Sequence, residues 1–156
     1  MEKLDDADLK ILDAMQRNAC LSTSELAEQV GLSQSPCWRR LTRLKEEGYF
    51  LAQVSILDAE KLGFNTMIFA QVKLSAHGHK NLDEFADQIG RMPEVIECFA
   101  VLGPFDFLLR IVTHDMKAYE RFVFGKLSSM PTVQEINSIA TLSKIKAGAA
   151  LPIRGR

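Results

Sequence analysis

The sequence lacks the features that assign a chain to a secreted or membrane class. Its three cysteines, Cys20, Cys37 and Cys98, are odd in number and widely spaced among 156 residues, which fits reduced thiols better than a disulfide framework. No apolar run reaches the ~18 residues that a membrane span needs. Acids at Glu2 and Asp5 argue against a signal peptide. We therefore expect a cytoplasmic protein with no membrane partner.

Side chains that commonly catalyse reactions or bind metals are also sparse. His77 and His79 could bind a metal, but no third ligand is near them in the sequence, and a solvated loop is the simpler interpretation. A nucleophile pair of Cys98 and His114 would need the two side chains to meet in space, which a sequence does not reveal. The chain has no phosphate-binding loop and no nucleophile elbow. We predict no catalytic residue, no metal, no cofactor and no enzyme activity.

Charge of one sign is not in excess either. The chain carries 19 Lys or Arg and 20 Asp or Glu, a net charge of −1. Residues 1–62 are acidic as a whole, with 8 basic and 11 acidic side chains, yet the stretch from Ser33 to Lys45 has four basic residues and no acid. A contact with a polyanion would therefore depend on this local cluster and not on a diffuse field.

The cationic stretch is predicted to be a helix over residues 35–47. Ser35 is a suitable cap, Pro36 then occupies the first helical position, and Gly48 supplies the left-handed stop. One apolar stripe, which packs inward, consists of Cys37, Leu41 and Leu44. The opposite side presents Ser35, Trp38, Arg39, Thr42 and Arg43, with Arg40 on the flank. A solvated basic face on an ordinary helix is the alternative interpretation.

Two capped helices are predicted before it. Asp5 begins the first, which ends near Arg17, and a capping box of Ser22 with Glu25 begins the second, which ends at Gly31. Only three residues separate that glycine from the cap of the third helix. Two short helices joined by a tight glycine turn, the second of them cationic, form a helix-turn-helix.

This motif predicts that helix 35–47 enters the major groove of double-stranded DNA. Arg39 and Arg43 are the best candidates for base edges or phosphates, while Arg40 meets a phosphate or a nearby acid. Trp38 either stacks on the DNA backbone or rests against the next helix. The full predicted DNA-binding set is Ser33, Gln34, Ser35, Trp38, Arg39, Arg40, Thr42 and Arg43.

The rest of the chain alternates strand and helix. Residues 49–57 are predicted to be extended, as a wing, a linker strand or both, and we place the domain boundary between residues 62 and 63. Strands are predicted over 66–74, 95–102, 105–112 and 133–142, and helices begin at the caps Asn81 and Asp115. The second helix is expected to bury Met116, Tyr119, Val123, Leu127 and Met130. This order, βαββαβ, is the ferredoxin-like split motif and gives an α+β fold with a winged helix-turn-helix in front.

The predicted sheet has one face covered by helices and another that still holds apolar side chains. In the first strand Ile68, Ala70, Val72 and Leu74 share one face. The uncovered face is expected to present Phe69, Phe99 and Phe107, and exposed apolar area of that kind calls for a partner surface. We expect this partner to be a second copy of the chain.

Short motifs in a particular order and spacing run along nearly the whole chain. In the first half they are Leu4-Asp5, Asp8, Ile11-Leu12, Leu26-Ala27, Val30 to Ser33, Pro36 to Leu41, and Leu44 with Glu47-Gly48. In the second half they are Met92 to Val95, Gly103 to Phe107, Ile145-Lys146 and Leu151-Pro152. Each fragment alone is weakly specific, but together they resemble the Lrp/AsnC (leucine-responsive, feast/famine) family of transcription regulators.

The resemblance implies a dimer, often arranged as a ring of four dimers, with an amino-acid effector bound between dimers. It implies that the turn from Gly103 to Asp106 holds the effector's amino group, with the backbone at Gly103 and the carboxylate of Asp106. Where the family often has two hydroxyl residues after the Ile-Lys motif, this chain has Ala147 and Gly148. The predicted effector set is Gly103, Pro104, Phe105, Asp106, Ala147 and Gly148. A simple hairpin turn capped by Asp106 is the alternative.

The function predicted from the sequence is therefore that of a DNA-binding transcriptional regulator whose oligomer responds to a small amino-acid-type effector. The alternative is an oligomeric metabolite-binding module with no direct role on DNA. The salt dependence of DNA retention separates the two, because phosphate contacts release counterions.

Overall fold

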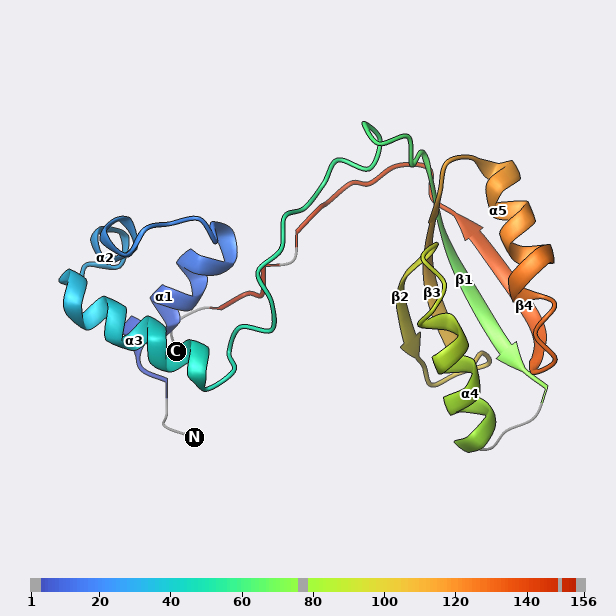
Figure 1. The fold of residues 1–156 in the computed structure, drawn as a ribbon, viewed down its shortest axis with the longest axis horizontal. Helices are drawn as coiled ribbons and strands as arrows, with labels where there is room; N and C mark the ends of the chain where they lie inside the picture. Colours follow the sequence, from blue (N-terminus) through green and yellow to red (C-terminus); the bar gives the residue numbers. More distant parts are fainter. Residues whose placement is uncertain (1–3, 76–78, 149, 154–156) are drawn as a thin grey trace. The chain divides into compact units, whose positions relative to one another are not determined.

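The computed structural model describes residues 4–75, 79–148 and 150–153, arranged in two compact units (Figure 1). The first unit contains the chain up to Ile56 together with the segment from Lys146 onward, and the second contains Leu57 to Ile145. The division drawn from the sequence, 1–62 and 63–156, differs from this one mainly at the C-terminal segment, which returns to the N-terminal unit.

The N-terminal unit consists of the helices α1 (Asp6–Arg17), α2 (Thr23–Val30) and α3 (Gln34–Glu46). The predicted N-cap Asp5 and the predicted capping box of Ser22 with Glu25 are present, and the structure shows that Asp5 also forms a capping box, with Asp8. Each box satisfies two backbone N–H groups that the first turn of a helix leaves without a partner. The predicted three-helix head with its helix-turn-helix is confirmed.

Helix α3 begins earlier than the sequence indicated. Its N-cap is Ser33, so Ser35 and Pro36 lie inside the first turn. The proline is tolerated there because N–H groups of the first turn have no intrahelical acceptor. The helix ends as predicted at Gly48, where φ is 78° and the N–H of Tyr49 donates to the carbonyl of Leu44 (3.1 Å).

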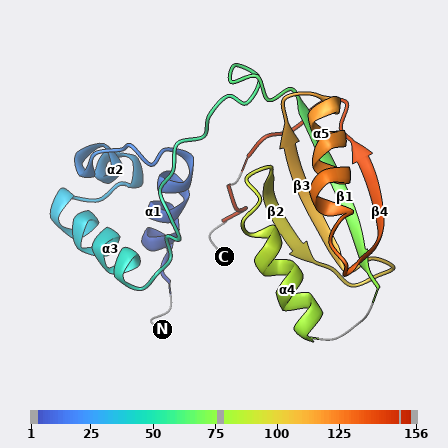
Figure 2. The ribbon, with the colours of Figure 1, turned by 45° about the vertical axis from the view of Figure 1, so that its right-hand side comes forward.

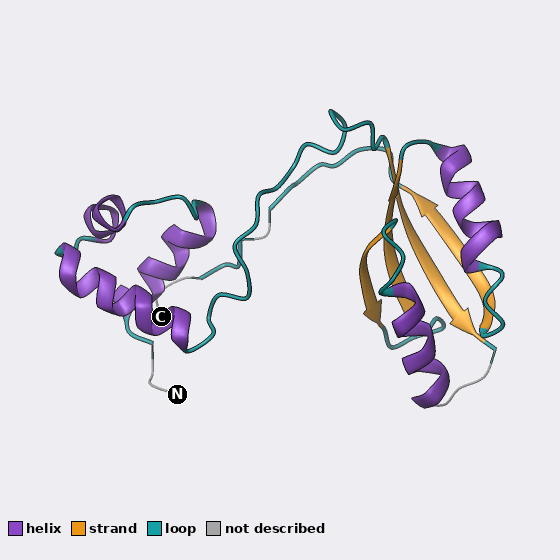
Figure 3. Ribbon diagram, viewed as in Figure 1, coloured by secondary structure: helices purple, strands orange, loops and turns teal. Residues whose placement is uncertain are grey.

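Residues 49–65 follow α3 and contain no strand (Figure 3). The expected strand over 49–57 is therefore absent, although Leu51, Val54 and Ile56 are as apolar as predicted and are exposed. A strand needs a neighbour for its backbone N–H and C=O groups, and no part of the described chain pairs with this segment.

The second unit is a four-stranded antiparallel sheet with its helices on one face (Figures 1 and 2). The strands are β1 (Thr66–Leu74), β2 (Val95–Ala100), β3 (Phe107–Thr113) and β4 (Val133–Ala140), in the order β2-β3-β1-β4. The helices are α4 (His79–Ile89) and α5 (Met116–Phe122), and a π-helical turn, η1 (Val123–Leu127), continues α5. This confirms the predicted ferredoxin-like βαββαβ motif. No helix in the described part of the chain is long and apolar enough to cross a membrane.

The core of this unit lies between the sheet and the two helices. Ile68, Ala70, Val72 and Leu74 are buried on the helix side, as predicted. Phe107 is also buried there, with its ring centroid 4.6 Å from that of Phe85, so its predicted place on the uncovered face is wrong. The reason is register, because Phe107 pairs with Val72, and directly paired residues share a face.

Two smaller expectations about the helices need correction, and one predicted residue lies outside the described chain. Helix α4 begins at His79, so Asn81 lies within the helix and not at its cap, while His77 is outside the described residues. Asp115 caps α5 as predicted, since its Oδ1 accepts from the N–H of Ala118 (2.6 Å). Met116, the first residue of α5, was expected to be buried and is exposed, whereas Phe122, which was not among the predicted core residues, is buried.

The uncovered face of the sheet remains apolar. Phe99 is 50% exposed, Ile139 is 49% exposed, and Phe69 between them in the sheet is half-buried. These residues lie on the face opposite the helices, because Phe69 pairs with Ile139 in the register of β1 with β4. The single chain therefore leaves an apolar surface of the kind that marks interaction sites.

Truncation of the central aromatic should destabilise the second unit. We expect Phe85→Ala to lower the free energy of unfolding by about 3–5 kcal/mol, because the ring is fully buried against Phe107. Urea unfolding followed by far-ultraviolet circular dichroism measures the change. Phe124→Ala, at a ring 71% exposed, is the control and should shift it by less than about 0.5 kcal/mol. Equal losses in the two variants would contradict this description of the core.

Candidate nucleic-acid interface and effector site

The outward side of α3 combines polar, aromatic and cationic groups. Ser33, Gln34, Ser35 and Arg39 are exposed, and Trp38 is 56% exposed. Thr42, one turn further along, is half-buried. The inward side of the helix, formed by Cys37, Leu41 and Leu44, packs in the core of the three-helix unit as the apolar stripe predicted. The helix is thus amphipathic, with an exposed side able to meet a second molecule.

Two of the three arginines in α3 are held by acids of α1. Asp8 is 1% exposed, and its two carboxylate oxygens accept from Arg40 Nη1 (2.9 Å) and Arg43 Nη2 (2.6 Å). Arg40 Nη1 also donates to Asp5 (2.7 Å). The N–H of Asp8 and the guanidinium of Arg40 both lower the pKa of Asp5, and these carboxylates raise the pKa of Arg40. We call this group, Asp5, Asp8, Arg40 and Arg43, the acid–arginine cluster.

The cluster corrects the predicted orientation of Arg43. The helical wheel placed it on the outward side near Arg39, but its guanidinium turns toward α1. The cause is the length of the side chain, which lets it reach from the edge of the helix to a buried carboxylate that the wheel of α3 alone does not include. Arg40 was expected to meet a phosphate or a nearby acid, and in the structure it meets two acids.

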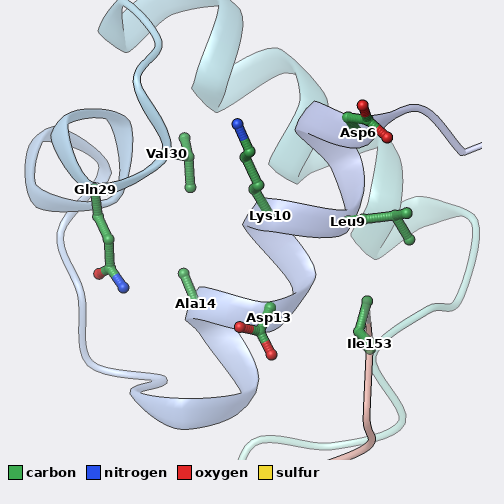
Figure 4. Close-up of a pocket in the computed structure, with 8 residues that line it drawn as sticks. All are labelled: Asp6, Leu9, Lys10, Asp13, Ala14, Gln29, Val30 and Ile153. Carbon is green, nitrogen blue, oxygen red and sulfur yellow. The ribbon is translucent and has the colours of Figure 1, made fainter. Parts of the chain in front are cut away.

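The C-terminal segment packs on α1 in the same unit. The side-chain amide of Gln16 donates to the carbonyl of Leu151 (2.9 Å) and accepts from its N–H (2.8 Å). Figure 4 shows Ile153 beside α1, at a pocket of about 320 Å³ that also borders Leu9, Ala14 and Val30. Sequence reasoning missed this contact, because a glutamine on a helix surface gives no signal of a partner 135 residues away.

The predicted effector turn lies between β2 and β3. Gly103 adopts a φ of 150°, and Gly103 and Pro104 are exposed, while Phe105 and Asp106 are half-buried. Asp106 Oδ2 accepts from the N–H of Leu74 (2.8 Å), and the N–H of Asp106 donates to the carbonyl of Val72 (2.9 Å). The carboxylate therefore joins the start of β3 to the end of β1, a structural role close to the turn-capping alternative.

The other predicted effector residues belong to a different part of the chain. Ala147 and Gly148 are exposed and lie in the segment that is grouped with the N-terminal unit. The six predicted effector residues therefore do not form one cluster within a single compact unit of this chain. Of the cysteines, Cys37 is buried, as predicted from its place on the apolar stripe, and burial raises the pKa of its thiol.

Together these features define a class of protein, a helix-turn-helix DNA-binding protein with a separate ferredoxin-like domain. Residues 4–50 match a family model of winged helix-turn-helix DNA-binding domains, and residues 67–151 match the model of the Lrp/AsnC ligand binding domain. The chain belongs to the Lrp/AsnC family of transcriptional regulators. The resemblance stated from the sequence motifs is thereby confirmed.

Similar proteins cover the chain almost from end to end. The proline dehydrogenase transcriptional activator of Rhizobium radiobacter is 39% identical over 145 residues, which are 93% of each chain. The DNA-binding transcriptional activator DecR of Escherichia coli is 35% identical, over 96% of this chain and 99% of that one. A transcriptional regulator of Neisseria meningitidis, solved as a complex with L-Met, superposes with a TM-score of 0.92 at 36% identity, covering 96% of this chain and 97% of that one.

Loss of the central acid should loosen the three-helix unit. We expect Asp8→Ala to lower the free energy of unfolding by about 1–3 kcal/mol, less than the ~3–5 kcal/mol seen for fully buried pairs, because Arg40 and Arg43 are about one third exposed. The fluorescence of Trp38, the single tryptophan of the chain, reports urea unfolding of this unit. Asp6→Ala, at an exposed acid of the same helix, is the control. A loss no larger than in that control would mean that the cluster does not stabilise the unit.

Proposed function

We propose that α3 is the recognition helix of this regulator and that its exposed side enters the major groove of double-stranded DNA. The observation that carries the proposal is the pairing of an exposed polar and cationic side with an inward side that packs firmly on α1 and α2. Arg39 is the principal candidate for base edges or phosphates. Ser33, Gln34 and Ser35, at the helix N-terminus, and Thr42 with Trp38 complete the contact surface.

Arg40 and Arg43 have a supporting role in this proposal. Their guanidinium groups bind Asp8, so they set the rotation of α3 about its own axis and thereby the direction of Arg39. About one third of each side chain is exposed, which leaves them able to add to the positive potential that attracts phosphate.

The uncovered face of the sheet supports self-association. Phe99 and Ile139 would be buried if two copies packed these faces together, which removes apolar area from water. A dimer presents two copies of α3 to half-sites roughly 34–36 Å apart or a multiple of that distance. An octamer of four dimers, which the family resemblance implies, is the larger assembly we propose.

An amino-acid-type effector is the proposed signal. The relative from Neisseria meningitidis was solved with L-Met, and the matching domain of this chain belongs to a family described as ligand-binding. Gly103, Pro104, Phe105 and Asp106 form the proposed contact turn of an effector site between dimers, and Ala147 and Gly148 are its proposed other side. The regulator acts in the cytoplasm as a binding protein and not as an enzyme.

Arg39 should contribute to DNA affinity and not to stability. We expect Arg39→Ala to weaken retention of operator DNA in a gel shift roughly 10- to 100-fold, because it removes a phosphate or base contact worth about 1–3 kcal/mol. Arg91→Ala, which removes an equal charge from the surface of the other domain, is the control and should bind as the parent protein does.

The same gel shift separates the regulator from the alternative metabolite-binding module. Affinity of the parent protein should fall steeply as salt rises from about 50 to 200 mM, since released counterions dominate such binding. No retention at any salt concentration, or equal retention of the Arg39→Ala and Arg91→Ala variants, would remove α3 from the role proposed here.

Asp106 should be needed for the response to an effector. We expect Asp106→Asn to abolish the change in operator affinity that an active amino acid causes in the parent protein, because the amide no longer attracts an ammonium group. Asparagine keeps a carbonyl oxygen for the N–H of Leu74, so the turn should stay folded. The measurement is a gel shift with and without each of the twenty amino acids. An undiminished response in the variant would place the regulatory contact elsewhere.

A further inference from the structure

A recess of about 500 Å³ in the second unit, apart from the turn at Gly103, is lined by residues of β3, α5 and η1 and by the segment just before β2. Its lining includes Phe64, Glu94, His114, Arg121, Phe122 and Lys126, and we call it the α5 recess. The volume falls within the range of about 300–1,000 Å³ typical of sites for small molecules. All of its lining residues belong to one compact unit, so a single chain is enough to form it.

One wall of the α5 recess is aromatic and fixed in place. The rings of Phe64 and His114 stack with centroids 4.4 Å apart and an angle of 17° between their planes. His114 Nδ1 lies 2.9 Å from the carbonyl oxygen of Gly63, and because a carbonyl oxygen only accepts, Nδ1 carries the proton. The φ of Gly63 is 81°, a conformation that favours glycine. The wall is therefore ordered before any ligand arrives.

The polar part of the recess is an ion pair with unused bonding capacity. Lys126 Nζ donates to Glu94 Oε1 (2.5 Å) and lies 5.9 Å from the centre of the Phe122 ring. The other oxygen of the carboxylate, Oε2, is buried and has no hydrogen-bond partner among the described residues. Burial raises the pKa of Glu94, but the hydrogen bond from Lys126, the backbone N–H of Glu94 and the positive charge of Lys126 together outweigh burial, so the pKa is lowered and the group is a carboxylate at neutral pH. A buried acceptor left unpaired is costly, and a ligand donor would remove that cost.

The position of Lys126 comes from an irregularity in the helix. It lies in the π-helical turn η1, and turns of this type occur frequently at functional sites. Arg121, one turn before it, is exposed at the same recess. The recess thus holds two cations and one carboxylate beside aromatic walls, a charge pattern that suits an anion which also carries a donor.

We propose that the α5 recess binds a small apolar carboxylic acid that bears an ammonium group, with the carboxylate at Arg121 and Lys126 and the ammonium at Glu94. The ammonium would donate to the carboxylate of Glu94, whose Oε1 accepts from Lys126 and whose Oε2 has no hydrogen-bond partner among the described residues. Phe64 and Phe122 contact the apolar side chain. The proposal rests on the proposed function in one respect, since it gives the regulator's second unit a ligand position within one protomer, separate from the turn that contains Asp106.

The ligand class is tested with three probes that share one skeleton. Isothermal titration of the full-length protein with L-phenylalanine, phenylpyruvate and 2-phenylethylamine compares the complete ligand with one that lacks the ammonium and one that lacks the carboxylate. Only L-phenylalanine should bind measurably. Comparable binding of either partial probe, or no binding of L-phenylalanine to the parent protein, would overturn the proposal.

The location is tested with variants that keep the size of the side chains. Glu94→Gln and Lys126→Met should each weaken L-phenylalanine binding roughly tenfold or more, because each removes a charged hydrogen bond to the ligand. Lys117→Met, at an exposed lysine of α5 outside the recess, should leave binding unchanged. Thermal melting of each variant establishes that it is folded. An unchanged isotherm in both recess variants would contradict the assignment, whereas loss of operator binding by the ligand-free protein would count only against the proposed function.

Discussion

The ion pairs between Asp8 of α1 and the two arginines of α3 are the interaction on which the DNA-binding unit depends. A carboxylate that is 1% exposed is stable only when it is paired, and both of its oxygens accept from a guanidinium. The apolar stripe of α3 defines which side is inward, but an apolar contact is not directional. The cluster adds direction, since it fixes how far the helix is rotated and therefore where Arg39 points.

The second unit is governed by a different constraint, the strict alternation of side chains along strands. Ile68, Ala70, Val72 and Leu74 bury one face of the sheet against α4 and α5, which leaves the other face with Phe69, Phe99 and Ile139. A ferredoxin-like motif has only two helices, and both lie on the same face. The uncovered apolar face and the α5 recess use different residues, because Phe69, Phe99 and Ile139 do not line the recess.

Sequence reasoning succeeded wherever a feature was local. The Asp5 cap of α1, the capping box of α2, the glycine end of α3 and the alternation in β1 each involve residues within a few positions of one another, and all were predicted correctly. Sequence reasoning failed where a contact between segments far apart in the chain decides where a side chain lies or whether a strand forms. Arg43 turned toward an acid 35 residues earlier. Phe107 entered the core because of its register with Val72, and the segment 49–57 forms no strand because no described part of the chain pairs with it.

The sequence by itself determined the family, the two domain types and the amphipathic character of α3, because motif order, helix caps and hydrophobic period are properties of neighbouring residues. Tertiary structure decided which arginine is exposed, that the C-terminal segment packs on α1 through Gln16, and that Phe64, Glu94 and Lys126 line one recess. These outcomes depend on long side chains and extended segments, whose partners are chosen by distance in space and by burial, and neither quantity can be obtained from spacing along the chain.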